Sequence, residues 1–199
     1  MSEMNREDWL TRLAELIAPM FGATTIPPYR VACSWPSKSA TSAKSRRIGE
    51  CWAPDCSDDK TTEIMITMGI DDPMNVAETL VHEMAHAVVG VQHGHKAAFK
   101  RCAQGIGLVG KMTATTAGEE LTERLNALLE DLPPYPHARL NAVNKKKQGT
   151  RMLKASCGCG YTVRLTQKWA DLGAPICPLC NINMIMDTYS IKQGQKKGE

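Results

Sequence analysis

Apolar positions recur every three or four residues in four segments of the chain, which is the periodicity of an amphipathic helix. The second segment has the clearest ends, because Asp72 suits an N-cap, Pro73 suits the first helical position and Gly90 supplies a stop. In the last segment, Thr116 and Glu119 have the spacing of a capping box. The other three predicted helices are residues 5–21, 95–104 and 117–131.

Three further segments alternate apolar and polar residues, as half-buried strands do. The last of them places Ile64, Ile66 and Met68 on one face. A Ser- and Lys-rich loop and a short turn separate the three segments. The pattern therefore predicts an α+β domain with a small antiparallel sheet, whose strands are residues 29–35, 46–53 and 61–68.

Prolines and a lysine triplet interrupt the periodic pattern after the last helix, as expected of a linker. A small cysteine-rich segment follows, and the chain ends in polar residues. The predicted organisation is a main domain over residues 1–132, a basic linker over 133–150, a cysteine-rich module over 151–189 and a flexible tail over 190–199.

The net charge of +3 hides an asymmetry between the two parts of this chain of 199 residues. Residues 1–138 hold 13 Lys and Arg against 18 Asp and Glu, whereas residues 139–199 hold 11 against 3. Such a division indicates a basic module that meets a polyanion, which makes DNA a candidate partner. A solubilising linker and tail would share this composition.

The chain carries no pattern of membrane insertion or export. Its longest apolar run, AVVGV, is far too short to cross a bilayer, and the polar start MSEMNREDWL lacks the pattern of a secretory signal. We therefore expect a cytoplasmic protein with no membrane partner. In that setting the eight cysteines are read as thiols or metal ligands rather than disulfides.

The second helix carries the motif H-E-x-x-H, formed by His82, Glu83 and His86. Two histidines four residues apart project from the same face of a helix, where both imidazoles can bind one Zn²⁺. Glu83 is rotated about 100° from His82 on an ideal helix. Its carboxylate is therefore placed to act as general base on a water molecule held by the metal, as in zinc hydrolases.

The third ligand is less determined by the sequence. The spacing H-E-x-x-H-x-x-G-x-x-H is absent, because Gln92 occupies the position of its third histidine. His93 and His95 both follow the bend after the helix and remain open. A ligand from a later helix would be Glu119 or Glu120, although acidic residues in a first helical turn also serve capping. Met112 is a candidate for an apolar floor under the metal, although a plain core methionine is the more common role.

The segments HEMAHAVVG, GHKAAF and GIGL resemble the SprT-like zinc metalloprotease family, whose members include DNA-associated proteases. In that family the third histidine follows a Gly and precedes Phe or Trp by four residues. His95, between Gly94 and Phe99, matches this pattern, while Lys96 stands where the family usually has Gly. The resemblance implies a zincin-like domain in which His82, His86 and His95 bind a catalytic zinc ion.

The cysteine-rich module has two close pairs separated by seventeen residues, and a tetrahedral zinc site of four thiolates needs this kind of arrangement. SprT-like proteins commonly carry a C-terminal zinc ribbon, which supports a second, structural zinc ion here. Between the pairs, Arg164, Lys168 and Trp169 are candidates for contacts with phosphates and bases. The first pair, C-x-C, is tighter than the usual C-x₂-C, which leaves open a site in which one of its cysteines is idle. The predicted ligands are Cys157, Cys159, Cys177 and Cys180.

These patterns predict a zinc-dependent metallopeptidase that hydrolyses peptide bonds, with proteins held on DNA as a candidate substrate class. A non-enzymatic protein that binds nucleic acid, or is associated with transcription, would use both zinc sites structurally. A metallohydrolase acting on a non-peptide amide is a third reading of the same motif.

Overall fold

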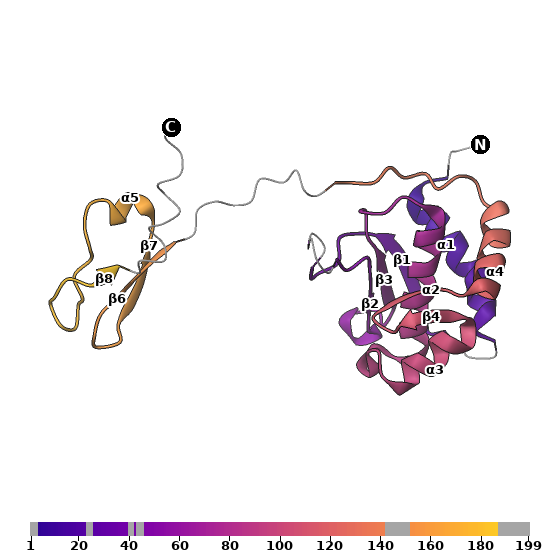
Figure 1. The fold of residues 1–199 in the computed structure, drawn as a ribbon, viewed down its shortest axis with the longest axis horizontal. Helices are drawn as coiled ribbons and strands as arrows, with labels where there is room; N and C mark the ends of the chain where they lie inside the picture. The colour runs from indigo at the N-terminus through magenta and orange to yellow at the C-terminus, as the bar shows by residue number, and fades with distance from the viewer. Residues whose placement is uncertain (1–3, 23–25, 40–41, 43–45, 142–151, 187–199) are drawn as a thin grey trace. The chain divides into compact units, whose positions relative to one another are not determined.

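The computed structural model describes residues 4–22, 26–39, 42, 46–141 and 152–186. The chain divides into two compact units, Met1–Asn144 and Lys145–Glu199. Figure 1 shows mixed α and β structure in both units, which makes the fold class α+β. Among the described residues, every helix is too short or too polar to cross a bilayer. The lysine triplet 145–147 and the tail 190–199 lie outside the described residues.

The first helix, α1 (Arg6–Ile17), begins at Asn5, whose side chain accepts a hydrogen bond from the backbone N–H of Asp8 at 2.9 Å. Most of the apolar stripe that the periodicity predicts is fully buried, while Leu16 and Met20 are partly buried. The α-helix ends earlier than expected because Pro19 interrupts it. The chain continues as a short 3₁₀ helix, η1 (Ala18–Phe21). The buried stripe consists of Trp9, Leu10, Leu13, Ala14 and Ile17.

All three predicted strands form, but the expectation of an antiparallel sheet is wrong. The strand order is β1–β3–β2, with β3 parallel to β1 and antiparallel to β2. Alternation along a strand identifies its buried face and carries no information about the direction of its neighbour. Because β3 inserts between the other two, β2 pairs only with β3 among the described residues. The strands are β1 (Tyr29–Cys33), β2 (Gly49–Trp52) and β3 (Thr62–Ile66).

The central helix, α2 (Pro73–Val89), packs against β2 and β3 and contributes much of the core. Both of its predicted ends are confirmed. The Asp72 side chain accepts a hydrogen bond from the backbone N–H of Asn75 at 2.8 Å, and Gly90 ends the helix at φ +90°. The chain then forms η3 (Val91–His93) and α3 (Ala97–Ile106).

A hairpin that the sequence did not predict follows α3. Its strands, β4 (Leu108–Lys111) and β5 (Ala114–Ala117), are antiparallel, and α4 (Glu119–Glu130) begins directly after them. The predicted capping box is therefore wrong, because Thr116 lies in β5 and Gly118 is the N-cap of α4, without a side-chain hydrogen bond.

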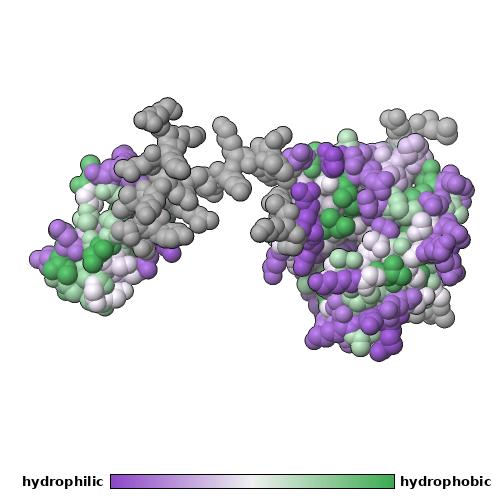
Figure 2. Space-filling model, in the orientation of Figure 1, coloured by the Kyte–Doolittle hydropathy of each residue, from purple (hydrophilic) through white to green (hydrophobic). Residues whose placement is uncertain are grey.

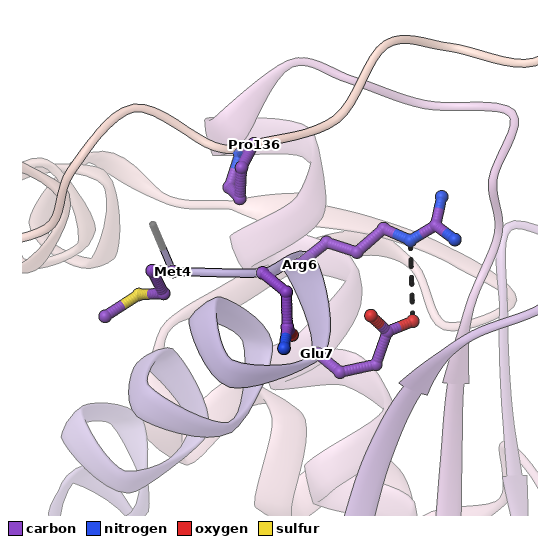
Figure 3. Close-up of a pocket in the computed structure, with 5 residues that line it drawn as sticks. Met4, Arg6, Glu7 and Pro136 are labelled. Carbon is purple, nitrogen blue, oxygen red and sulfur yellow. Dashed lines mark ion pairs between the residues drawn. The ribbon is translucent and has the colours of Figure 1, made fainter. Parts of the chain in front are cut away.

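The first unit extends beyond the predicted boundary at residue 132. The Trp9 indole N–H donates to the Pro133 carbonyl at 2.8 Å, and Tyr135 is buried against the Trp9 ring at a centroid distance of 4.6 Å. Further along, His137 Nε2 lies 3.1 Å from the carbonyl oxygen of Met68. Figure 3 shows Pro136 beside the start of α1, across a pocket of about 430 Å³ that contains none of the predicted site residues.

The second unit is a three-stranded antiparallel sheet of order β7–β6–β8 with a single turn of helix. Its core is small and includes two of the cysteines, namely Cys157 and Cys177, beside Ala155 and Met184. Several large apolar side chains remain exposed, and Figure 2 shows hydrophobic surface on this unit. The elements are β6 (Leu153–Ser156), β7 (Thr162–Leu165), α5 (Gln167–Ala170) and β8 (Ile185–Met186).

Candidate metal centres

Three imidazoles converge beside α2. His82 and His86 project from neighbouring turns of this helix, and His95 reaches them from the bend between η3 and α3. The Nε2 atom of His95 lies 3.1 Å from that of His82 and 3.2 Å from that of His86. His93, the other candidate, is exposed and does not belong to this group among the described residues.

The separations of these nitrogens fit a tetrahedral metal ion. Ligands at the usual zinc–nitrogen distance would lie about 3.3 Å from one another in a tetrahedron. Burial lowers the pKa of His82 to about 4 and that of His86 to about 3, with the neighbouring imidazoles acting in the same direction. These rings are therefore neutral near pH 7, the form in which imidazole binds metal. Burial lowers the pKa of His95 as well. Three imidazoles whose ring nitrogens lie this close together form a donor set for a divalent cation.

Phe99 forms the apolar floor of this centre. Its fully buried ring stacks on His86 at a centroid distance of 4.2 Å, and it also lies 4.8 Å from His82 and 5.0 Å from His95. Met112, which the sequence offered for this role or as a plain core methionine, is partly buried and packs against the hydrophobic core. The sequence feature that points to Phe99 as the floor is its position four residues after His95.

His82 and His86 differ in the environment of Nδ1, the ring nitrogen that points away from the centre. His82 Nδ1 lies 2.7 Å from the hydroxyl oxygen of Thr115, which is on β5. His86 Nδ1 is buried and has no hydrogen-bond partner among the described residues. The ring of His86 is therefore placed by its stacking on Phe99, whereas His82 has a polar partner from the hairpin.

Glu83 is buried next to these ligands, with 7% of its surface exposed. Burial raises the pKa of its carboxyl to about 8; the positive charge of Arg47 opposes this shift and the negative charge of Glu50 adds to it. The strand β2 passes directly over the Glu83 side chain at Gly49. A buried carboxyl with a raised pKa, one residue from a candidate metal ligand, has the properties of a general base.

Arg47 and Glu50 form a charged cluster at this side of the site, which the sequence interpretation missed. Glu50 accepts hydrogen bonds from the backbone N–H and the hydroxyl of Ser37, at 2.8 and 2.7 Å, and pairs with the Arg47 guanidinium at 2.5 Å. Although burial opposes its ionisation, these donors hold the pKa of Glu50 below its usual value. The only sequence signal was a pair of arginines just before a strand.

The four cysteines of the second unit also converge. Sγ atoms of Cys159 and Cys177 lie 3.6 Å apart, close to the separation of about 3.8 Å that a tetrahedral zinc–thiolate site requires. Backbone hydrogen bonds shape the two turns that carry the cysteines, and the amide of Tyr161 lowers the pKa of the Cys159 thiol to about 7. Every predicted cysteine is in this group, which consists of Cys157, Cys159, Cys177 and Cys180.

The remaining cysteines join neither group among the described residues. Burial, with a further contribution from the nearby Glu83 carboxyl, raises the pKa of Cys51 to about 12. Burial likewise raises the pKa of Cys33 and of Cys102. These three side chains are therefore protonated thiols near neutral pH, and neither metal binding nor nucleophilic chemistry is assigned to them.

Comparison with known proteins adds no further assignment. No protein-family model, curated protein or solved structure matches the chain.

Proposed function

We propose that this chain is a zinc-dependent metallopeptidase with a zincin-like catalytic unit and a C-terminal zinc ribbon. The observation that carries the proposal is the convergence of three Nε2 atoms, with separations of 3.1 and 3.2 Å to His95, beside the buried carboxyl of Glu83. His82, His86 and His95 would bind the catalytic ion, and the four cysteines would bind a structural one. The resemblance of the H-E-x-x-H and Gly-His segments to SprT-like proteases supports the same assignment.

The residues around the centre fit peptide hydrolysis. A zinc ion held there would polarise the peptide carbonyl and lower the pKa of a water molecule. The buried carboxyl of Glu83, which is adjacent to His82 in the chain, would act as the general base that accepts a proton from water and passes it to the leaving amine. Arg47, which is paired with Glu50, contributes positive charge near Glu83. The exposed side chain of His95 leaves the centre open to a substrate.

The edge of the sheet supports a peptide substrate rather than a small amide. Among the described residues, β2 pairs with β3 on one side only. An extended peptide can add to such an edge through backbone hydrogen bonds. Because Gly49 of β2 lies against Glu83, a peptide bound along β2 would pass beside the general base.

The second unit supports a polyanionic partner. Lys154 and Arg164 are direct cross-strand partners in the β6–β7 pair, an arrangement that disfavours the free protein because like charges repel. Bound phosphates would relieve this repulsion. Trp169, with 57% of its surface exposed, lies near Lys168 at 5.2 Å and is available to stack on a base. We therefore propose DNA as the partner of this unit and DNA-associated proteins as the substrate class.

The decisive experiment is a cleavage assay with the zinc-loaded full chain. An unfolded protein substrate is incubated with the chain alone, with single-stranded DNA and with double-stranded DNA, and each arm is repeated with Glu83→Gln. Cleavage that needs Glu83 supports the proposal, and stimulation by DNA supports the substrate class. DNA binding without cleavage in any arm favours the alternative of a non-enzymatic nucleic-acid-binding protein with structural zinc sites.

A further inference from the structure

The β4–β5 hairpin is attached to α2 at two points that lie one helical turn apart. The Glu78 carboxylate accepts a hydrogen bond from the backbone N–H of Ala117 at 2.7 Å, and His82 Nδ1 lies 2.7 Å from Oγ1 of Thr115. Four helical residues rise about 6 Å, and two strand residues advance about 6.7 Å. The spacings of the two elements therefore match, so that β5 runs alongside this face of α2.

This attachment determines which nitrogen of His82 faces the centre. A neutral imidazole carries one proton, and the nitrogen that keeps its lone pair is the one that can bind a metal. When Nδ1–H donates to Thr115 Oγ1, the lone pair is left on Nε2, the atom that lies 3.1 Å from Nε2 of His95. A hydroxyl can accept from Nδ1–H or donate to Nδ1, but when Nε2 gives its lone pair to a metal only the first arrangement is possible. Thr115 Oγ1 is placed to accept in that state and fixes the rotation of the ring.

The other two histidines have no comparable anchor among the described residues. His86 Nδ1 has no partner, and the contacts of its ring are with Phe99 and the neighbouring imidazoles. Thr115 itself is half-buried, whereas its neighbour Thr116 points to the opposite side of β5 and is exposed. Among the described residues, His82 is therefore the ligand whose geometry depends on a side chain far away in the sequence.

We propose that Thr115 is a positioning residue for the metal centre: held in place by the Glu78–Ala117 hydrogen bond, it selects the tautomer of His82 and thereby increases metal affinity. The inference rests on the metal centre of the proposed function but does not depend on peptide cleavage. The β4–β5 hairpin carries none of the proposed ligands, but through Thr115 it orients one of them.

The test compares three full-length variants with the wild-type chain. Thr115→Val keeps the shape of the side chain and removes the hydroxyl that accepts the hydrogen bond from His82. Thr115→Ser keeps that hydroxyl, and Thr116→Val is the matched control on the exposed face of β5.

The affinity of the histidine centre for zinc is measured by competition against a chromophoric chelator. Titration with cobalt distinguishes this centre from the cysteine site, because only thiolate ligands give sulfur-to-metal charge-transfer absorption. We expect Thr115→Val to lower the affinity about 10- to 100-fold. Thr115→Ser and Thr116→Val should remain near the wild type.

Three outcomes would overturn the inference: wild-type affinity in Thr115→Val, an equal loss in Thr116→Val, or no metal at the histidines of the wild-type chain. If Thr115→Val does not fold, ¹⁵N NMR of the metal-free wild-type protein decides instead. A proton on Nδ1 of His82 is expected, and a proton on Nε2 contradicts the inference. Metal binding that responds to Thr115, without cleavage of any peptide, would leave this inference standing and end the peptidase assignment.

Discussion

A Cβ atom built on Gly49 would lie 2.5 Å from Oε1 of Glu83, closer than any ordinary contact between such atoms. The same Cβ would also meet the Glu83 and Thr79 side chains at 2.7 Å. Strand β2 can therefore lie on α2 at this place only because residue 49 has no side chain. Glu83 owes its burial, and with it the raised pKa of its carboxyl, to this close approach.

Replacing Gly49 with Ala should damage both stability and activity. The methyl group forces β2 away from Glu83, and overpacking of this kind costs about 1–3 kcal/mol of unfolding free energy. Urea unfolding measures the stability, and peptide turnover measures the displacement of the base. Gly105→Ala is the matched control, because nothing lies within 4 Å of a Cβ at Gly105 in α3. A Gly49→Ala protein as stable and active as the Gly105→Ala protein would contradict the close contact.

Replacing Glu83 with Gln should abolish cleavage and leave the metal in place. The amide keeps the shape of the side chain but cannot accept a proton, so we expect kcat to fall about 10²- to 10⁴-fold. Metal content and turnover are measured on the same preparation. Glu119→Gln serves as the control, since this exposed residue at the start of α4 lies outside the histidine group. If Glu119→Gln lost as much metal as Glu83→Gln, Glu119 would again be a candidate metal ligand.

The two histidines after α2 should differ in their effect on metal binding. His95→Ala removes one of the three converging nitrogens and should weaken zinc binding by more than the roughly 10- to 100-fold typical of losing an outer partner. His93→Ala removes an exposed imidazole outside the group and should leave zinc binding unchanged. Competition with a chelator measures both variants. A greater loss in His93→Ala would exchange the roles of the two residues.

The stability of the metal-free protein should fall with rising pH because of Glu83. The unfolded chain ionises this carboxyl near pH 4.5, whereas the folded chain retains the proton up to a pKa of about 8. Between these values the folded state binds more protons, so this group makes the unfolding free energy decrease by at most about 1.4 kcal/mol per pH unit.

Comparison with Glu83→Gln isolates this contribution, because both proteins contain the same histidines. The unfolding free energy of the variant minus that of the wild type should increase from pH 4.5 to pH 8 and then level off. Urea titrations in the presence of a chelator provide the measurement. A difference that does not vary with pH would mean that Glu83 titrates alike in the folded and unfolded chains.

Lys154 and Arg164, which face each other across the β6–β7 pair, should contribute to DNA binding. If Arg164 contacts a phosphate, Arg164→Gln should weaken binding and reduce the slope of log K against log salt by about 0.7–0.9. Arg124→Gln, which removes the same charge from the exposed surface of α4, is the control for net charge. Fluorescence anisotropy over a range of salt concentrations gives both slopes. Equal slopes for the two variants would exclude a specific phosphate contact at Arg164.

The sequence predicts those parts of the site that lie close together along the chain. His82, Glu83 and His86 share one helix, so their spacing alone places them together. The ends of α2 were predictable for the same reason, since Asp72 and Gly90 act on the backbone next to them.

The parts that escaped prediction depend on contacts between distant segments. The strands of the hairpin are four residues long, and their attachment to α2 joins Thr115 to a residue 33 positions earlier. The importance of Gly49 follows from the helix packed against it, which alternation along a strand does not reveal. The direction of β1 relative to β3 is equally absent from the pattern, because parallel and antiparallel neighbours can bury the same face.

The hydrogen bond from Trp9 to Pro133 has a consequence for synthesis on the ribosome. The first helix receives its indole acceptor from a residue 124 positions later in the chain. At about 5–20 residues per second, this partner emerges roughly 6–25 s after Trp9. Until then the indole N–H lacks its native acceptor, so the packing of α1 is completed only after residue 133 has been translated.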